Sequence, residues 1–166
     1  MVNRRDEHGV GADAFALMLA SFASKVCMEN EGNSRRKLFE VGRRIGERMS
    51  DDFFMFAKPI RQMDVDEVIE SVSKCFFPLY FSYTPRVDVC FITLEGFCVL
   101  KYSRKAEECI EILCGILQGV YCSVSRQDVV FEVGLRKNEH CIAVRAEKER
   151  KAPVVVGIDS AAKRSG

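Results

Sequence analysis

Two segments of the chain have the residue pattern of helices, yet each carries a pair of glycines one helical turn apart. Gly42 and Gly46 lie in VGRRIGERMSDDFF, and Gly115 and Gly119 lie in ILCGILQGVYC. A glycine in a helix interior costs about 1 kcal/mol relative to alanine, so each helix carries this cost twice on one stripe. A stripe without side chains lets another backbone approach closely. We therefore predict that these four glycines are helix-packing positions, which limits the fold to one with tightly packed helices.

Apolar residues at spacings of three and four predict four helices. Asp13 and Ser34 are suitable N-caps for the first two, and Pro59 ends the second. The third helix starts at Asp64 or Asp66 and ends or kinks at Pro78. The expected spans are 13–29, 34 to just before 59, 64 or 66 to about 78, and 106–122.

Four segments rich in β-branched and aromatic residues predict strands. Val87–Leu94 is expected to form a hairpin with FCVLKY through a turn at Glu95-Gly96, and DVVFEVGLR is expected to pair with HCIAVRAEK. The element order is then ααα-ββ-α-ββ. This order predicts an α+β fold, with a four-stranded antiparallel sheet packed with helices.

The chain of 166 residues is the right length for one domain. We expect a flexible start over residues 1–11, a single α+β domain over residues 12–147, and a flexible basic tail over residues 148–166. The tail contains VVVGI, which could instead add to a sheet edge.

Charge and cysteine content limit the compartment and the partners. The net charge is +1 although 30% of the residues are charged, which argues against a nucleic-acid partner. The start, MVNRRDEHGV, lacks the apolar core of a secretory signal, so we expect a cytoplasmic protein. Its eight cysteines are then expected to be reduced, and most of them fall in apolar runs typical of buried positions.

The sequence carries no recognisable catalytic or cofactor motif. The sequence has no phosphate-binding loop, no nucleophile elbow and no cysteine pairs at zinc-site spacing. Asp51 and Asp52 are adjacent, so they do not face each other on a helix; His140 has no partner in sequence, and neither has Cys114. We predict no catalytic residue, no metal site and no cofactor. The basic clusters NSRRK and GRR fit a solvated helix face, or alternatively peripheral contact with an acidic membrane or partner.

The first helix has more apolar surface than one buried face requires. Leu17 and Ala20 extend the apolar surface beyond the stripe that contains Phe15, Leu19 and Phe22. An exposed patch of this kind usually marks an interface. We predict that Phe15, Leu17, Leu19 and Phe22 contact a partner protein.

Both glycine segments resemble the signature helices of the small α+β subunits of TRAPP, the transport protein particle. The first segment follows the pattern L-x-x-φ-G-x-x-φ-G-x-R-φ-φ-[DE]-x-F, where φ is apolar, and the second follows C-G-φ-φ-x-G. The element order also agrees, and the resemblance covers about residues 12 to 147. The matching residues are Leu38, Val41, Gly42, Ile45, Gly46, Arg48, Met49, Asp51 or Asp52, Phe53 or Phe54, and Cys114, Gly115, Ile116, Leu117 and Gly119.

The resemblance implies a scaffold role in vesicle tethering between the endoplasmic reticulum and the Golgi apparatus. The chain would form a homo- or heterodimer with a subunit of the same fold and contribute, through the assembly, to nucleotide exchange on a Rab GTPase. Its first helix looks like that of the subunit-five type. The subunit-three type has an acyl-accepting cysteine before the third helix, where this chain has KPIRQMD. Two alternatives stay open: a small-molecule-binding domain of the related vinyl-reductase type, and a thiol or metal enzyme.

Overall fold

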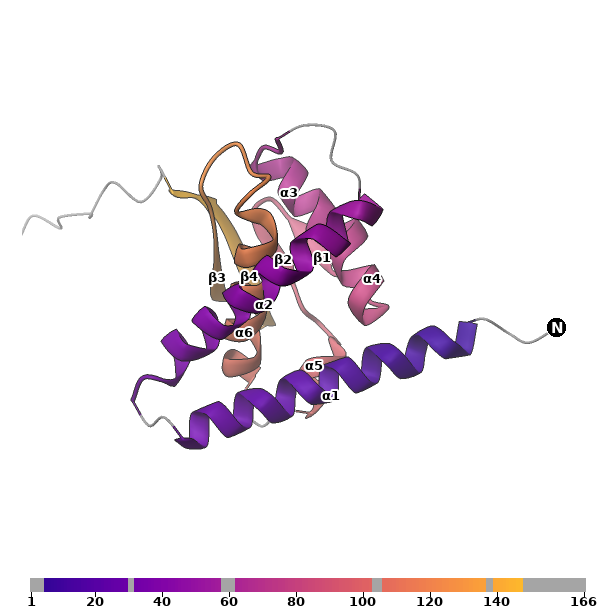
Figure 1. The fold of residues 1–166 in the computed structure, drawn as a ribbon, viewed down its shortest axis with the longest axis vertical. Coiled ribbons are helices and arrows are strands. Elements are labelled where there is room, and N and C mark those ends of the chain that lie inside the picture. The colour runs from indigo at the N-terminus through magenta and orange to yellow at the C-terminus, as the bar shows by residue number, and fades with distance from the viewer. Residues whose placement is uncertain (1–4, 30–31, 58–61, 103–105, 137–138, 148–166) are drawn as a thin grey trace, which may run out of the picture.

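Helices pack in layers against a four-stranded antiparallel sheet in the computed structural model (Figure 1). The structure describes residues 5–29, 32–57, 62–102, 106–136 and 139–147. In chain order the elements are α1 (Arg5–Glu29), α2 (Ser34–Ala57), α3 (Val65–Ser71), the π-helix η1 (Val72–Phe76), α4 (Phe77–Phe81), β1 (Arg86–Asp88), β2 (Phe91–Thr93), α5 (Cys98–Tyr102), α6 (Ala106–Tyr121), β3 (Val129–Arg136) and β4 (Glu139–Ala146). No helix among these residues is both long and apolar enough to span a lipid bilayer. The predicted α+β class and the four-stranded antiparallel sheet are confirmed.

The sheet has the strand order β1-β2-β4-β3, and every neighbouring pair is antiparallel. Ile92 of β2 is opposite Ile142 of β4, and Phe131 of β3 is opposite Val144 of β4. These four side chains are buried in the core. Strands β1 and β3 are the two edges of the sheet.

Helix α6 lies at the centre of the fold, between the sheet and α2. Its apolar residues are buried on all sides of the helix, which is typical of a central core helix. At its C-terminal end, the ring of Tyr121 contacts Phe53 and Phe54 of α2 and Phe131 of β3. The Tyr121 hydroxyl and Ser71 of α3 form a buried hydrogen bond of 2.9 Å. This aromatic contact joins α2, α6 and the sheet.

Helix α1 begins at Arg5, eight residues before the expected start at Asp13. Residues 5–11, expected to be flexible, are therefore helical. Arg5, Asp6 and Glu7 include good helix formers, and no proline interrupts the segment. Asp13 lies inside the helix, so it is not the N-cap. The expected tail 148–166, including VVVGI, lies outside the described residues.

The predicted strand Val87–Leu94 is wrong as a single strand. The chain turns back at Val89 and Cys90, so that β1 and β2 form a hairpin within this segment. Val89 has a φ of 54°, in the left-handed region. The sequence has none of the Asn-Gly or Asp-Gly signals that normally mark such a turn, which explains the incorrect prediction.

The predicted partner strand FCVLKY is also wrong, because Cys98–Tyr102 forms the short helix α5. Phe97, just before it, is buried against the rings of Phe77 and Phe81. Helix α5 also packs against α1. Tertiary packing therefore overrides the β-propensity of this segment, although the predicted turn at Gly96 is present with a φ of 70°.

The third predicted helix is three consecutive helical segments that pass through Pro78. Asp64 caps α3, and its side chain and that of Glu67 form a reciprocal capping box. The wider π-turn follows, in which the Phe77 N–H donates to the Val72 carbonyl. Pro78 then lies in the first turn of α4, where its missing N–H is tolerated. The helical path ends at Ser82, which has a φ of 48°.

Candidate functional site

The two glycine pairs face each other across the contact between α2 and α6. A Cβ atom added to Gly46 would lie 2.9 Å from both the carbonyl carbon of Ile116 and the amide nitrogen of Val120. One added to Gly119 would lie 2.7 Å from the amide nitrogen of Glu47. Gly42 and Gly115 have equally close main-chain neighbours on the opposite helix. Backbone atoms cannot rotate away as side chains do, so neither helix has room for even one methyl group there.

Ion pairs surround this helix contact. On α2, Arg43 pairs with Glu40 at 2.9 Å and also with Glu47, while Arg35 pairs with Glu107 of α6. The hydrogen bond from Arg43 lowers the pKa of Glu40. Arg35, Glu47 and Glu107 are exposed, and Arg43 and Glu40 are only half-buried, so each pair adds little to stability. Both arginines of the predicted GRR cluster are therefore matched by carboxylates, since Arg44 also pairs with Glu40 at 3.3 Å.

The buried face of α1 consists mainly of small residues and includes one large side chain, Leu19, so large apolar side chains do not mark it. The spacing of alanines at three and four is the sequence signal that would have identified it. The buried residues are Ala12, Ala16, Leu19, Ala20, Ala23 and Cys27. This alanine-rich face lets α1 lie close to the rest of the fold.

The four predicted interface residues separate into three groups. Leu19 is buried in the chain's own core, with 4% of its surface exposed, so it presents no free surface. Phe15 is partly buried against Tyr80 and Phe81 of α4. Leu17 and Phe22 are 50% and 39% exposed. The outer face of α1 is therefore defined by Leu17, Phe22 and Met18, which is 59% exposed and was not among the predicted residues.

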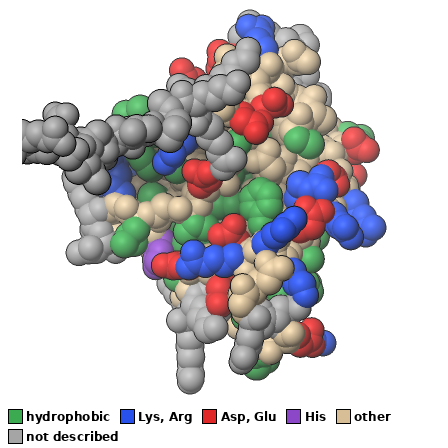
Figure 2. All heavy atoms as spheres, turned by 90° about the vertical axis from the view of Figure 1, so that its left-hand side faces the viewer, with side chains coloured by type: hydrophobic (Ala, Val, Ile, Leu, Met, Phe, Trp, Pro, Cys, Tyr) green, Lys and Arg blue, Asp and Glu red, His purple; other side chains and the backbone are tan. Residues whose placement is uncertain are grey.

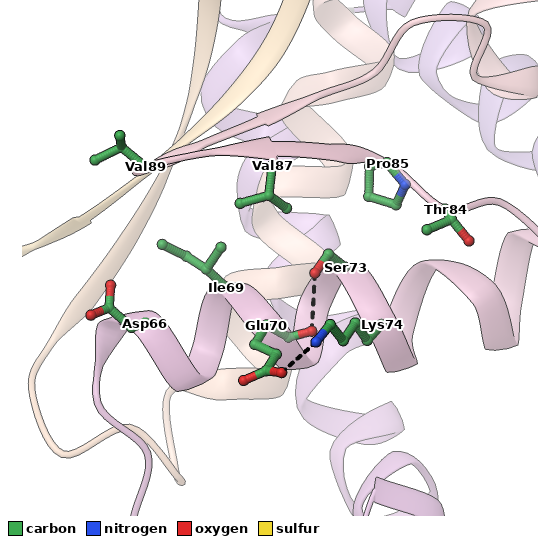
Figure 3. A pocket seen from close by; sticks show the side chains of 9 residues that line it. All are labelled: Asp66, Ile69, Glu70, Ser73, Lys74, Thr84, Pro85, Val87 and Val89. Carbon is green, nitrogen blue, oxygen red and sulfur yellow. Dashed lines mark hydrogen bonds and ion pairs between the residues drawn. The ribbon is translucent and has the colours of Figure 1, made fainter.

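A groove of about 430 Å³ separates α3 and η1 from the segment that leads into β1 (Figure 3). Ile69 forms its helical wall, and Pro85, Val87 and Val89 form the opposite wall. On the helical wall, Lys74 pairs with the Glu70 carboxylate at 2.6 Å, and Ser73 donates to the Glu70 backbone carbonyl. These polar groups bind each other, so the groove is a mainly apolar surface. The sequence alone did not indicate it.

The chemically reactive groups are scattered over the fold. No three His, Cys, Asp or Glu side chains of the described residues are grouped as metal ligands. Asp51 and Asp52 are exposed at the C-terminal part of α2, and His140 is half-buried on β4. Cys114 is buried in α6, and burial raises the pKa of its thiol well above the usual value. A thiol in this environment is a poor nucleophile.

The expectation that most cysteines are buried holds for Cys27, Cys109, Cys114 and Cys141. It is wrong for two cysteines at helix surfaces, Cys75 and Cys122, which are exposed. Cys90 and Cys98 are half-buried. Within the described residues, no two cysteines form a disulfide.

Thiol labelling should separate these two environments. At pH 8, a chromogenic disulfide reagent should react with Cys75 and Cys122 within seconds to minutes. Cys114 should react at least about a hundredfold more slowly, because it is buried and little of it is thiolate at that pH. Guanidinium added under non-reducing conditions should expose all eight thiols. A count below eight in the denatured protein would show a disulfide or a blocked thiol.

The face of the molecule shown in Figure 2 carries Lys and Arg side chains interleaved with Asp and Glu. Cross-strand pairs on the sheet follow this pattern: Arg136 pairs with Asp88 at 2.5 Å and lies over the ring of Phe91. Arg145 is 3.7 Å from Glu132. This face therefore has none of the one-sided basic surface that binds nucleic acids.

Comparisons with known proteins agree with the arrangement of these helices. The family model for transport protein particle (TRAPP) components matches residues 15–145. The fold is similar to the crystal structure of a trafficking protein particle complex subunit 3 from Naegleria fowleri covalently bound to palmitic acid, with a TM-score of 0.70 and 17% sequence identity. The match covers 83% of this chain and 96% of that chain, and it shows a shared fold. Because the family model spans most of the sequence, including both glycine pairs, the chain belongs to the family of TRAPP components.

Proposed function

We propose that this chain is a scaffold subunit of a vesicle-tethering complex that acts between the endoplasmic reticulum and the Golgi apparatus. Membership of the TRAPP family makes it a component of a trafficking complex. In the finer role proposed here, it dimerises with a small subunit of the same fold and is peripheral at these membranes. Through the assembly it contributes to nucleotide exchange on a Rab GTPase. Assignment to the subunit-five type stays a prediction.

The exposed apolar residues on the outer face of α1 are the observation that supports a scaffold role. Leu17, Met18 and Phe22 are three large apolar side chains exposed to solvent on one helix. Exposed apolar patches on a soluble domain commonly mark protein interfaces. The reactive groups, in contrast, are dispersed or buried in the described part of the chain. The features available for function are therefore surfaces.

Affinity capture tests the scaffold role directly. The tagged full chain, expressed at its native level in the source cell, should bring down other small TRAPP subunits in near-equal amounts. A fluorescent fusion of the chain should co-localise with markers of the endoplasmic reticulum or Golgi. A chain recovered alone, under conditions that preserve a known trafficking complex, would contradict the proposal.

Nucleotide exchange should require the assembly. The isolated chain is expected to leave the release of a fluorescent guanine nucleotide from a secretory Rab at the intrinsic rate, while an assembly that contains it should accelerate release. Exchange requires a surface that binds the nucleotide-free GTPase more tightly than the loaded one, and we assign most of that surface to other subunits. Full acceleration by this chain alone would contradict the scaffold role. Arg43 and Arg44 on α2 would then be the first candidate GTPase contacts.

A further inference from the structure

Strand β1 is an exposed sheet edge that stands above an apolar groove. It is the terminal strand of the sheet, and its three residues, Arg86–Asp88, are all exposed. An uncovered edge presents backbone N–H and C=O groups that are ready to pair with another strand. Beside this edge, the groove presents Ile69 and Val87 (Figure 3). Such a site suits an extended segment with apolar side chains on one face.

Val89, at one end of this groove, has an unusual backbone conformation. It is 83% exposed, and its φ of 54° lies in the left-handed region, where a β-branched residue is an outlier. A glycine would make the same turn without strain. The turn alone therefore does not account for an exposed valine. Its side chain extends the apolar wall of the groove to the tip of the β1–β2 hairpin.

We propose that the C-terminal segment Val154–Ile158 docks in this groove and runs antiparallel along the free edge of β1. In an extended strand, alternate side chains point to the same face. Val154, Val156 and Ile158 would then face the groove, and Val155 and Gly157 would face away. The tail thereby covers the exposed edge and the apolar wall together. This inference does not depend on the proposed function.

The position of the last described residues places the tail at the correct end of the groove. The Val144 N–H donates to the Cys90 carbonyl at 2.8 Å, next to Val89. Strand β4 continues from there to Ala146, and Glu147 is the last described residue. The tail therefore starts beside the hairpin tip. Strands β1 and β4 are both antiparallel to β2, so they run in the same direction, toward the hairpin tip. A segment that follows β4 and runs back along β1 is therefore antiparallel to β1.

The connecting residues are long enough for this path. Six residues, 148–153, separate Glu147 from Val154, and six extended residues span up to about 20 Å. The free side of β1 lies three strand spacings from β4 in the order β4-β2-β1, which is about 14 Å. Pro153 precedes the valines, and a proline is tolerated at the first residue of an edge strand.

The charges at the entrance of the groove complement those of the tail. Asp66 lies at the same end as Val89 (Figure 3), and it is exposed in the acidic first turn of α3. The first residues of the tail, KERK, include Lys148, Arg150 and Lys151. Opposite charges at the entrance and apolar side chains beyond it favour this segment as the occupant.

Amide hydrogen exchange of β1 tests the docking. Residues 86–89 should exchange at least about tenfold more slowly in the full chain than in a chain that ends at Glu147. The triple variant V154S/V156S/I158S should exchange like the shortened chain, while the matched control Val155→Ser should keep the protection. Asp66→Lys should reduce the protection several-fold. A synthetic peptide of residues 148–166, added to the shortened chain, should restore it.

Several results would overturn the proposal. Equal exchange in the full chain and the triple variant, with no protection by the peptide, would show that the tail does not bind there. Protection that increases with protein concentration would place the tail on a second copy instead of its own groove. Protection that appears only after another TRAPP subunit is added would identify that subunit as the occupant.

Discussion

Replacing Gly46 by leucine is expected to lower the free energy of unfolding by about 3 kcal/mol or more, the upper range for overpacking. The added side chain would start at a Cβ that already lies 2.9 Å from main-chain atoms of Ile116 and Val120. Because these atoms belong to the backbone of α6, relief requires the two helices to separate. Separation would also open the buried contacts of α6 with the sheet. Urea unfolding followed by circular dichroism measures the effect.

A matched control distinguishes this clash from a general effect of leucine on the helix. Arg48→Leu places the same side chain two residues along α2 at an exposed position, where substitutions usually change stability by less than about 0.5 kcal/mol. Gly46→Ala gives a second test, because the direction of its effect on stability differs between an open helix site and a packed one. At an open helix site, this change would stabilise the protein by up to about 1 kcal/mol; here it should destabilise it. A higher unfolding midpoint for either Gly46 variant would show that the helices do not meet closely there.

Local sequence signals were sufficient for most of the helices and for the last two strands. Ser34 starts α2 as expected, and α6 and the β3–β4 pair differ from their expected spans by only one or two residues. In these segments, propensity, apolar spacing and helix caps favour the same structure. Secondary structure can be predicted from local sequence where these signals agree. The overall class followed because these segments dominate the fold.

The region between Val87 and Tyr102 could not be predicted in this way, because packing decides its structure. A left-handed valine makes the hairpin turn, and the burial of Phe97 favours a helical turn over a strand. Neither cause is visible in local sequence. The groove beside β1 depends on this region, so it could not be predicted either.

The buried faces of α1 and α2 could not be predicted from the positions of large apolar residues. On α2 the buried stripe includes Gly42 and Gly46 themselves, while the much larger Phe56 is 73% exposed. On α1 four alanines are buried, while Leu17, Met18 and Phe22 face outward. Where backbones come close, small residues occupy the contact, so the largest apolar residues do not mark the buried face. The candidate interface was therefore only partly predicted.

Replacing Leu17 by lysine is expected to weaken dimerisation at least about tenfold, equivalent to about 1.4 kcal/mol of binding free energy. Leu17 is half exposed on the outer face of α1, beside the still more exposed Met18. A dimer that covers this face would bury the leucine, and a lysine there would place an unpaired charge in an apolar contact. The fold of the monomer should be unchanged because the side chain is not part of its core. Sedimentation equilibrium, with the far-UV spectrum as a check of folding, measures both quantities.

Leu135→Lys is the matched control for this prediction. Leu135 is 67% exposed on β3, the edge strand at the far side of the sheet from β1, so the same substitution is made at an exposed leucine outside α1. If α1 forms the interface, Leu17→Lys shifts the protein toward monomer while Leu135→Lys leaves the dissociation constant unchanged. An equal loss in both variants would indicate a nonspecific effect of charge. The wild-type chain could instead stay monomeric at high concentration and with every small TRAPP subunit tested. That result would contradict the prediction that the outer face of α1 is an interface, since its apolar side chains would then have no partner to bury them.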